Sequence, residues 1–126
     1  MEFQQQIDYW RQSSEDDLEA AESLFNNHKF RQALFFIHLS IEKILKSHVV
    51  KNTRDVPPRI HDLLRLANLS GLKISDLQRK VLSRFQFYCL EGRYPDFQPS
   101  PPSEKETQNE LNEARSIYLW LANQLK

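Results

Sequence analysis

Apolar residues recur every three or four positions along most of this chain, which is the spacing of one face of an α-helix. The pattern predicts long helices over residues 3–26 and 30–51, a short helix over 60–67, and two more long helices, from about residue 76 to Gly92 and from residue 104 to the C-terminus. No segment alternates apolar and polar residues beside hairpin turn residues. We therefore predict an all-α fold, an up-and-down bundle of four long helices and one short helix, formed by a single domain over residues 1–126.

The starts of the last two long helices are marked by capping boxes. Ser75 is followed three residues later by Gln78, and Ser103 by Glu106. In the first of these two helices the stripe expected to face the core is Leu77, Val81, Phe85 and Tyr88.

The predicted helix over residues 30–51 is apolar on two sides. Its core stripe is Phe30, Leu34, Ile37, Ile41, Leu45 and His48, while Phe35, Phe36 and Leu39 lie on the other side. Such a helix is either central in its own bundle or shared with a partner subunit. In a bundle this small we favour the subunit interface, and we predict a homodimer formed through this helix.

Composition excludes several classes of function. Seventeen basic and seventeen acidic residues cancel, so no global basic field exists and any nucleic-acid contact must be local. The single Cys89 excludes an internal disulfide framework, and no apolar run is long enough to span a membrane. The N-terminal residues lack the features of a secretory signal, so we expect a cytoplasmic protein.

Cofactor and metal chemistry are not expected either. The four histidines have no acidic or cysteine neighbours at zinc-site spacing. The two glycines stand alone, which excludes Walker-type and dinucleotide-binding loops. We predict neither a metal nor a cofactor.

Two parts of the chain carry candidate chemistry. Pro95 should end a helix at or just before Arg93, which leaves Arg93 either to meet a phosphate or carboxylate, or to support the terminal carbonyl groups. His38 lies one turn before Glu42, close enough for the carboxylate to favour the imidazolium, although a satisfied histidine within an interface is the alternative.

The neighbouring charges are less informative. We expect Glu42, Lys43 and Lys46 to form a solvated or interface-bordering face. His61 and Asp62 begin the short helix, where Asp62 should favour the positive end of the helix dipole.

Three segments together resemble the HEPN family in order and approximate spacing: Phe36 to Lys46, His61-Asp62-Leu63, and Gly92-Arg93-Tyr94-Pro95-Asp96. The resemblance implies a compact helical bundle, usually dimeric and often encoded beside a small nucleotidyltransferase in prokaryotic toxin–antitoxin pairs. Many members are metal-independent ribonucleases in which an arginine is followed, after four to six residues, by a catalytic histidine.

The chain departs from that motif. Arg93 matches the arginine, but Gln98, Pro99 and Ser100 occupy the positions of the histidine, and the tyrosine that some partners modify is also missing. Whether the chain is an enzyme therefore stays open.

Three functions are compatible with these residues. The first is a nucleotide- or phosphate-binding module and nucleotidyltransferase partner, with ligand contacts from Arg93, Tyr94, Lys43, Lys46 and His61. The second is a divergent ribonuclease that uses Arg93 with a relocated histidine such as His38. The third is a purely structural interaction bundle.

Overall fold

The computed structural model describes residues 2–93 and 102–126, with the side chains of residues 90–93 left out of that description. These residues form five α-helices: α1 (Phe3–Asn26), α2 (Phe30–Thr53), α3 (Leu63–Ser70), α4 (Asp76–Arg93) and α5 (Glu104–Gln124). The described part of the chain contains no β-strand. The predicted all-α fold is confirmed, with four long helices and one short helix.

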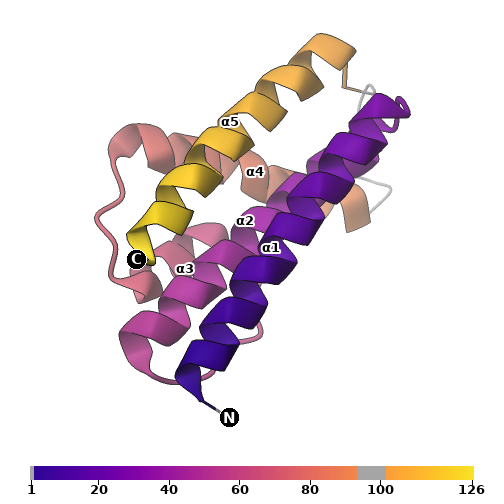
Figure 1. Cartoon of the computed structure of the whole chain (residues 1–126). Coiled ribbons are helices and arrows are strands. Elements are labelled where there is room, and N and C mark those ends of the chain that lie inside the picture. Colours follow the sequence, from indigo (N-terminus) through magenta and orange to yellow (C-terminus); the bar gives the residue numbers. More distant parts are fainter. Residues whose placement is uncertain (1, 94–101) are drawn as a thin grey trace.

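Helix α2 occupies the centre of the bundle. It pairs along its length with the antiparallel α1, and α3, α4 and α5 also pack against it (Figure 1). Fourteen of its residues, from Ala33 to Val50, are buried. The central position of α2 accounts for much of its two-sided apolar pattern, and Phe35, Phe36 and Leu39 remain half-buried.

Two serines allow α1 and α2 to approach closely. Ser14 Oγ donates a hydrogen bond to the Ser40 carbonyl oxygen at 2.6 Å, and Ser40 Oγ donates to the Ser14 carbonyl oxygen at 2.9 Å. Both side chains are fully buried. Each serine hydroxyl donates its proton to a carbonyl oxygen of the opposite helix, so both small polar residues have a hydrogen-bond partner in the core.

The turn between α1 and α2 is a Schellman motif. Lys29 N donates to the Leu24 carbonyl oxygen at 2.8 Å and His28 N donates to the Phe25 carbonyl oxygen at 2.9 Å. His28 takes the left-handed conformation, with φ of 60°, that glycine usually supplies at this position. The chain therefore reverses within three residues.

Side-chain caps set the starts of the later helices. The Asp62 carboxylate accepts from Arg65 N at 3.2 Å, so α3 begins at Leu63. The start at residue 60 that was predicted from the two prolines at 57–58 was wrong. The two predicted capping boxes are confirmed, since Ser75 and Gln78, and likewise Ser103 and Glu106, exchange hydrogen bonds.

The buried face of α4 differs from the predicted stripe. Leu77 is 74% exposed, whereas Leu82, Phe85 and Cys89 are buried. Val81 and Tyr88 lie at the edge of the core. The core-facing stripe is therefore rotated by about one residue and begins a turn later than predicted.

A buried histidine joins α2 to the end of α5. His48 Nε2 donates to the Leu121 carbonyl oxygen at 2.7 Å, and the side chain is 2% exposed. Burial lowers the pKa of His48 below its usual 6.5, because the charged imidazolium would lose its hydration. The predicted place of His48 in the α2 core stripe is confirmed.

Candidate functional site

The candidate site centres on Glu42, where α1, α2 and the loop before α3 meet. Glu42 is only 4% exposed. Its Oε1 accepts a hydrogen bond from His61 Nδ1 at 2.9 Å, and its Oε2 accepts from Lys46 Nζ at 3.0 Å. Both carboxylate oxygens therefore have a partner, as a buried carboxylate requires.

Of the solvated or interface-bordering face expected for Glu42, Lys43 and Lys46, the solvated alternative was wrong for Glu42 and Lys46. Lys46 is 6% exposed, and its Nζ lies 5.2 Å from the centroid of the Trp10 ring. Trp10 of α1 covers the ammonium group on one side and Glu42 neutralises it on another. The pair is buried because α1 and the loop before α3 fold over a stretch of α2 that is polar in sequence.

Lys43 belongs to a neighbouring pair and not to the Glu42 cluster. Its Nζ lies 2.8 Å from Asp17 Oδ2 and donates to Ser13 Oγ at 2.9 Å. The Lys43 charge is thus engaged with α1, and it is more exposed than Lys46.

His61 is the member of the cluster that reaches the surface. Its side chain is 52% exposed. Because a carboxylate can only accept, the Glu42 contact places a proton on His61 Nδ1. The other ring nitrogen, Nε2, has no hydrogen-bond partner among the described residues. It is available for a hydrogen bond with an external group.

His38 contacts both Glu42 and His61. Its side chain is fully buried, its Nδ1 lies 3.8 Å from Glu42 Oε1, and its Nε2 donates to the His61 carbonyl oxygen at 3.0 Å. The proximity to Glu42 expected from the four-residue spacing is therefore present. With no exposed surface, His38 is positioned to hold the backbone of His61 and not to touch a ligand.

The loop that carries His61 is also tied to α4. Leu63 N donates to Gln86 Oε1 at 2.7 Å. Arg93 ends α4 as predicted, two helical turns beyond Gln86, which is roughly 10 Å along the helix axis. The Arg93 side chain, and all of Tyr94, Gln98, Pro99 and Ser100, lie outside the described residues.

The structure thus brings together three predicted site residues, His38, Lys46 and His61, and leaves Lys43 beside them. Sequence reasoning missed Trp10 as the cover of Lys46 and Asp17 as the partner of Lys43. Trp10 falls in the apolar stripe of α1, and nothing in the spacing of one helix shows which charge of another helix it covers.

A second buried glutamate, Glu110, also escaped the sequence reasoning. It lies between α4 and α5, where Oε1 accepts from Arg84 Nη2 at 2.8 Å and Oε2 accepts from Arg84 Nε at 3.2 Å. The Tyr88 hydroxyl donates to Oε2 at 2.6 Å. The hydrogen bonds to Glu110 raise the pKa of Arg84 above its usual value, so this guanidinium stays charged.

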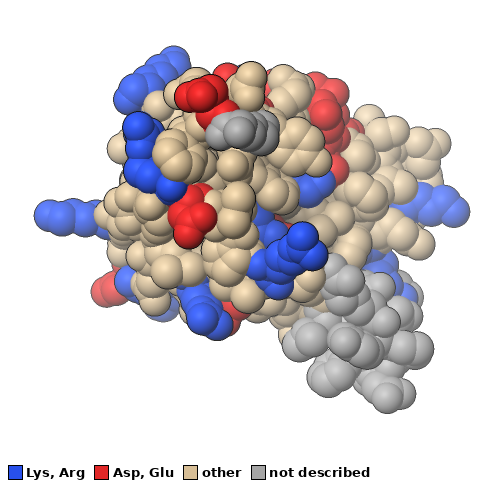
Figure 2. Space-filling model, turned by 90° about the horizontal axis from the view of Figure 1, so that it is seen from below, with Lys and Arg blue, Asp and Glu red and all other residues tan. Residues whose placement is uncertain are grey.

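The surface charges are mixed in sign. Figure 2 shows one face of the molecule, on which Lys and Arg side chains are interspersed with acidic and uncharged ones and form no continuous field. The side chains that the structure describes, those of residues 2–89 and 102–126, include no group of three or more His, Cys, Asp or Glu that could hold a metal ion. None of the described helices is long and apolar enough to cross a membrane.

Comparison with known proteins places these observations in a family. The model of the HEPN domain matches residues 7–125. The fold is similar to the crystal structure of TT1696 from Thermus thermophilus, with a TM-score of 0.78, 20% identity, and coverage of 93% of this chain and 96% of that one. It is also similar to ST0689, an archaeal HEPN homologue, with a TM-score of 0.68, 19% identity, and coverage of 95% and 98%. No curated protein matches the sequence.

Proposed function

The chain belongs to the HEPN domain family, and we propose that it acts as a nucleotide- or phosphate-binding module without the standard ribonuclease activity of that family. One observation carries this proposal. His61 is half-exposed, its ring is fixed through Nδ1 by the buried Glu42, and its Nε2 is open to a ligand.

The charges around His61 suit an anion. An exposed imidazole that gains a proton donates from Nε2 to a phosphate oxygen, and such charge-assisted hydrogen bonds are stronger than neutral ones. Glu42 alone would repel an approaching anion. Lys46, 3.0 Å from Glu42, cancels that negative charge, so the protonated imidazole leaves the cluster with a net positive charge.

The remaining predicted ligand residues contribute unequally to this proposal. Lys43 is engaged by Asp17, so it ranks after His61 as a phosphate contact. Arg93 and Tyr94 stay in the proposal on the strength of the sequence motif, with Arg93 at the end of α4.

Isothermal titration calorimetry with inorganic phosphate and adenosine monophosphate tests the proposal. We expect wild-type protein to bind and His61→Asn to bind at least tenfold more weakly, since a charge-assisted hydrogen bond is worth about 1.5–3 kcal/mol. The matched control is His28→Asn, which removes another exposed imidazole near a glutamate, Glu104, and which keeps a residue that tolerates the left-handed backbone. Equal binding by wild-type and His61→Asn protein would contradict the proposal.

A divergent ribonuclease is the second candidate, because a carboxylate that orients an imidazole is also the arrangement of a general acid–base pair. The exposures of the two histidines favour His61 over His38 as the relocated histidine, since His38 is fully buried. RNA cleavage in the presence of a metal chelator would support this candidate if Arg93→Ala and His61→Asn both abolish it. Intact RNA with the wild-type protein would reject it.

A homodimer and a small nucleotidyltransferase partner complete the proposal. The half-buried Phe35, Phe36 and Leu39 support a dimer through α2, and Leu39→Glu should then halve the mass found by sedimentation. The nucleotidyltransferase rests on the motif resemblance alone. Co-purification with the product of a neighbouring nucleotidyltransferase gene tests it, and two proteins that migrate separately when mixed would reject it.

A further inference from the structure

An aromatic pair on α1 lies beside the Glu42 cluster. The rings of Tyr9 and Trp10 meet edge to face with centroids 5.2 Å apart. Trp10 is half-buried, but Tyr9 is 60% exposed, which makes it one of the few large apolar side chains in the described residues that face solvent. Neither the helix pattern nor the core requires an exposed aromatic ring there.

A continuous row of contacts joins this pair to His61. Trp10 covers Lys46, with the ammonium 5.2 Å from the ring centroid. Lys46 reaches Glu42 at 3.0 Å, and Glu42 holds His61 at 2.9 Å. An exposed aromatic ring and an exposed imidazole thus form the two ends of one row, with buried and mutually neutralised charges between them.

We propose that Tyr9, backed by Trp10, stacks on the base of a nucleotide whose phosphate is held by His61. This inference rests on the proposed phosphate-binding function and names its ligand class: an unpaired nucleotide, either free or within a single strand. Aromatic side chains bind single-stranded nucleic acid by stacking on bases of any sequence, and basic groups beside them hold the backbone.

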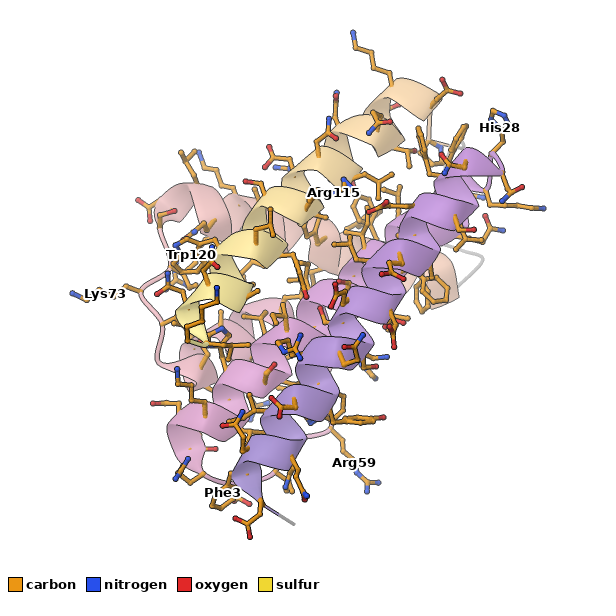
Figure 3. The ribbon with its side chains drawn as sticks, viewed as in Figure 1. Phe3, His28, Arg59, Lys73, Arg115 and Trp120 are labelled. Carbon is orange, nitrogen blue, oxygen red and sulfur yellow. The ribbon has the colours of Figure 1, made fainter. Side chains whose placement is uncertain are left out.

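Arg59 is a candidate contact for a further phosphate when the nucleotide is part of a single-stranded nucleic acid. It is exposed, lies two residues before His61, and points outward from the molecule (Figure 3). In a single strand the phosphate next to the one on His61 would be its natural partner. A duplex is a poor alternative, because its bases are already stacked on one another and the chain has no net positive charge to hold its phosphates.

Titrations with inorganic phosphate, ribose 5-phosphate and adenosine monophosphate test the inference. We expect wild-type protein to bind adenosine monophosphate at least tenfold more tightly than ribose 5-phosphate. Tyr9→Ala should remove about that factor for the nucleotide and leave phosphate affinity unchanged, because stacking is worth roughly fivefold to a hundredfold or more per base. Tyr9→Phe should retain nucleotide affinity.

Phe87→Ala is the matched control, since Phe87 is a 44% exposed aromatic residue on α4. It should leave all three affinities unchanged. Titrations with an unpaired oligonucleotide and its duplex then distinguish the sources of the ligand. A site for single-stranded nucleic acid should bind the unpaired oligonucleotide more tightly than adenosine monophosphate and the duplex. A site for free nucleotides should bind adenosine monophosphate more tightly than either oligonucleotide.

The outcomes separate this inference from the function on which it rests. If wild-type protein binds phosphate and adenosine monophosphate equally well, or if Tyr9→Ala does not weaken the nucleotide, the stacking role is overturned and the phosphate site stands. Preference for the duplex would also overturn it. If wild-type protein binds none of the three ligands, the proposed function itself fails.

Discussion

Glu42 and Glu110 are both buried glutamates in this protein, 4% and 9% exposed, yet their surroundings differ in kind. Glu110 is held by a guanidinium and a phenol, which join α4 to α5. Arginine does not release its proton in proteins, so the positive charge of Arg84 in the Glu110 cluster is permanent. It acts as a fixed connection between two helices that otherwise pack mainly on α2.

The Glu42 cluster contains an imidazole where the Glu110 cluster has a guanidinium. His61 is half-exposed, and only one of its ring nitrogens has a hydrogen-bond partner among the described residues. Lys46 is buried in turn and neutralises the carboxylate. We therefore place the proposed site at Glu42 and not at Glu110, because one ring nitrogen of His61 has no hydrogen-bond partner among the described residues.

The largest effect should come from Glu42→Ala. The substitution leaves Lys46 buried without a counter-charge, and removing one partner of a buried pair costs about 3–5 kcal/mol of unfolding free energy. Urea unfolding followed by circular dichroism measures it, with the exposed Glu19→Ala on α1 as a control that should change stability by about 0.5 kcal/mol or less. A loss below about 1 kcal/mol would show that Lys46 is not held by Glu42.

Glu110→Ala should have a smaller effect, about 1–2 kcal/mol. The Arg84 side chain is 45% exposed, so water replaces most of its lost contact, and the main cost is the broken link between α4 and α5. The same unfolding measurement applies, with Glu113→Ala as an exposed control on α5. If Glu110→Ala proved as damaging as Glu42→Ala, the contrast between the two clusters would be lost.

The smallest expected effect is a loss of unfolding free energy in acid that comes from His48. Measuring it separates this contribution from the pH dependence of the rest of the protein. Burial lowers the folded-state pKa of His48, so the unfolded chain takes up a proton as pH falls through about 6.5 while the folded chain does not. This contribution to stability is therefore present above the unfolded value and lost below it. We expect unfolding free energy to fall by about 1 kcal/mol from pH 7.5 to 5.5 on this account.

His48→Gln should remove that part of the pH dependence. Unfolding curves of wild-type and variant protein at the two pH values measure it, and any pH dependence left in the variant does not come from His48. Parallel slopes in the two proteins would show that His48 does not titrate as its burial implies.

Most of the fold could be predicted because the residues that determine the helix ends lie next to those ends in the sequence. The Ser75 and Ser103 capping boxes and the proline after Arg93 all act within one turn of the chain. Helix α3 starts three residues later than the two prolines at 57–58 predict, because the Asp62 side chain caps it by accepting from Arg65 N. The exposure of Leu77 could not be predicted, since it depends on how α4 is rotated against α2 and not on its own spacing.

The candidate site could be predicted only in part, for the same reason. The approach of His38 to Glu42 follows from a four-residue spacing on one helix. The meeting of Glu42 with His61, 19 residues away, and of Lys46 with Trp10 depends on tertiary packing. Burial of the Glu42 and Lys46 charges therefore could not be inferred from a polar stretch of sequence.

The central position of α2 also bears on the order in which the chain folds. The α1–α2 hairpin closes through a three-residue turn and is synthesised before α3, α4 and α5, so its contacts need the least loop closure. We expect each later helix to dock onto α2 after this hairpin has formed. We expect the hydrogen bond of His48 to form late, because its acceptor at Leu121 lies 73 residues further along the chain, and only the docking of α5 completes the core.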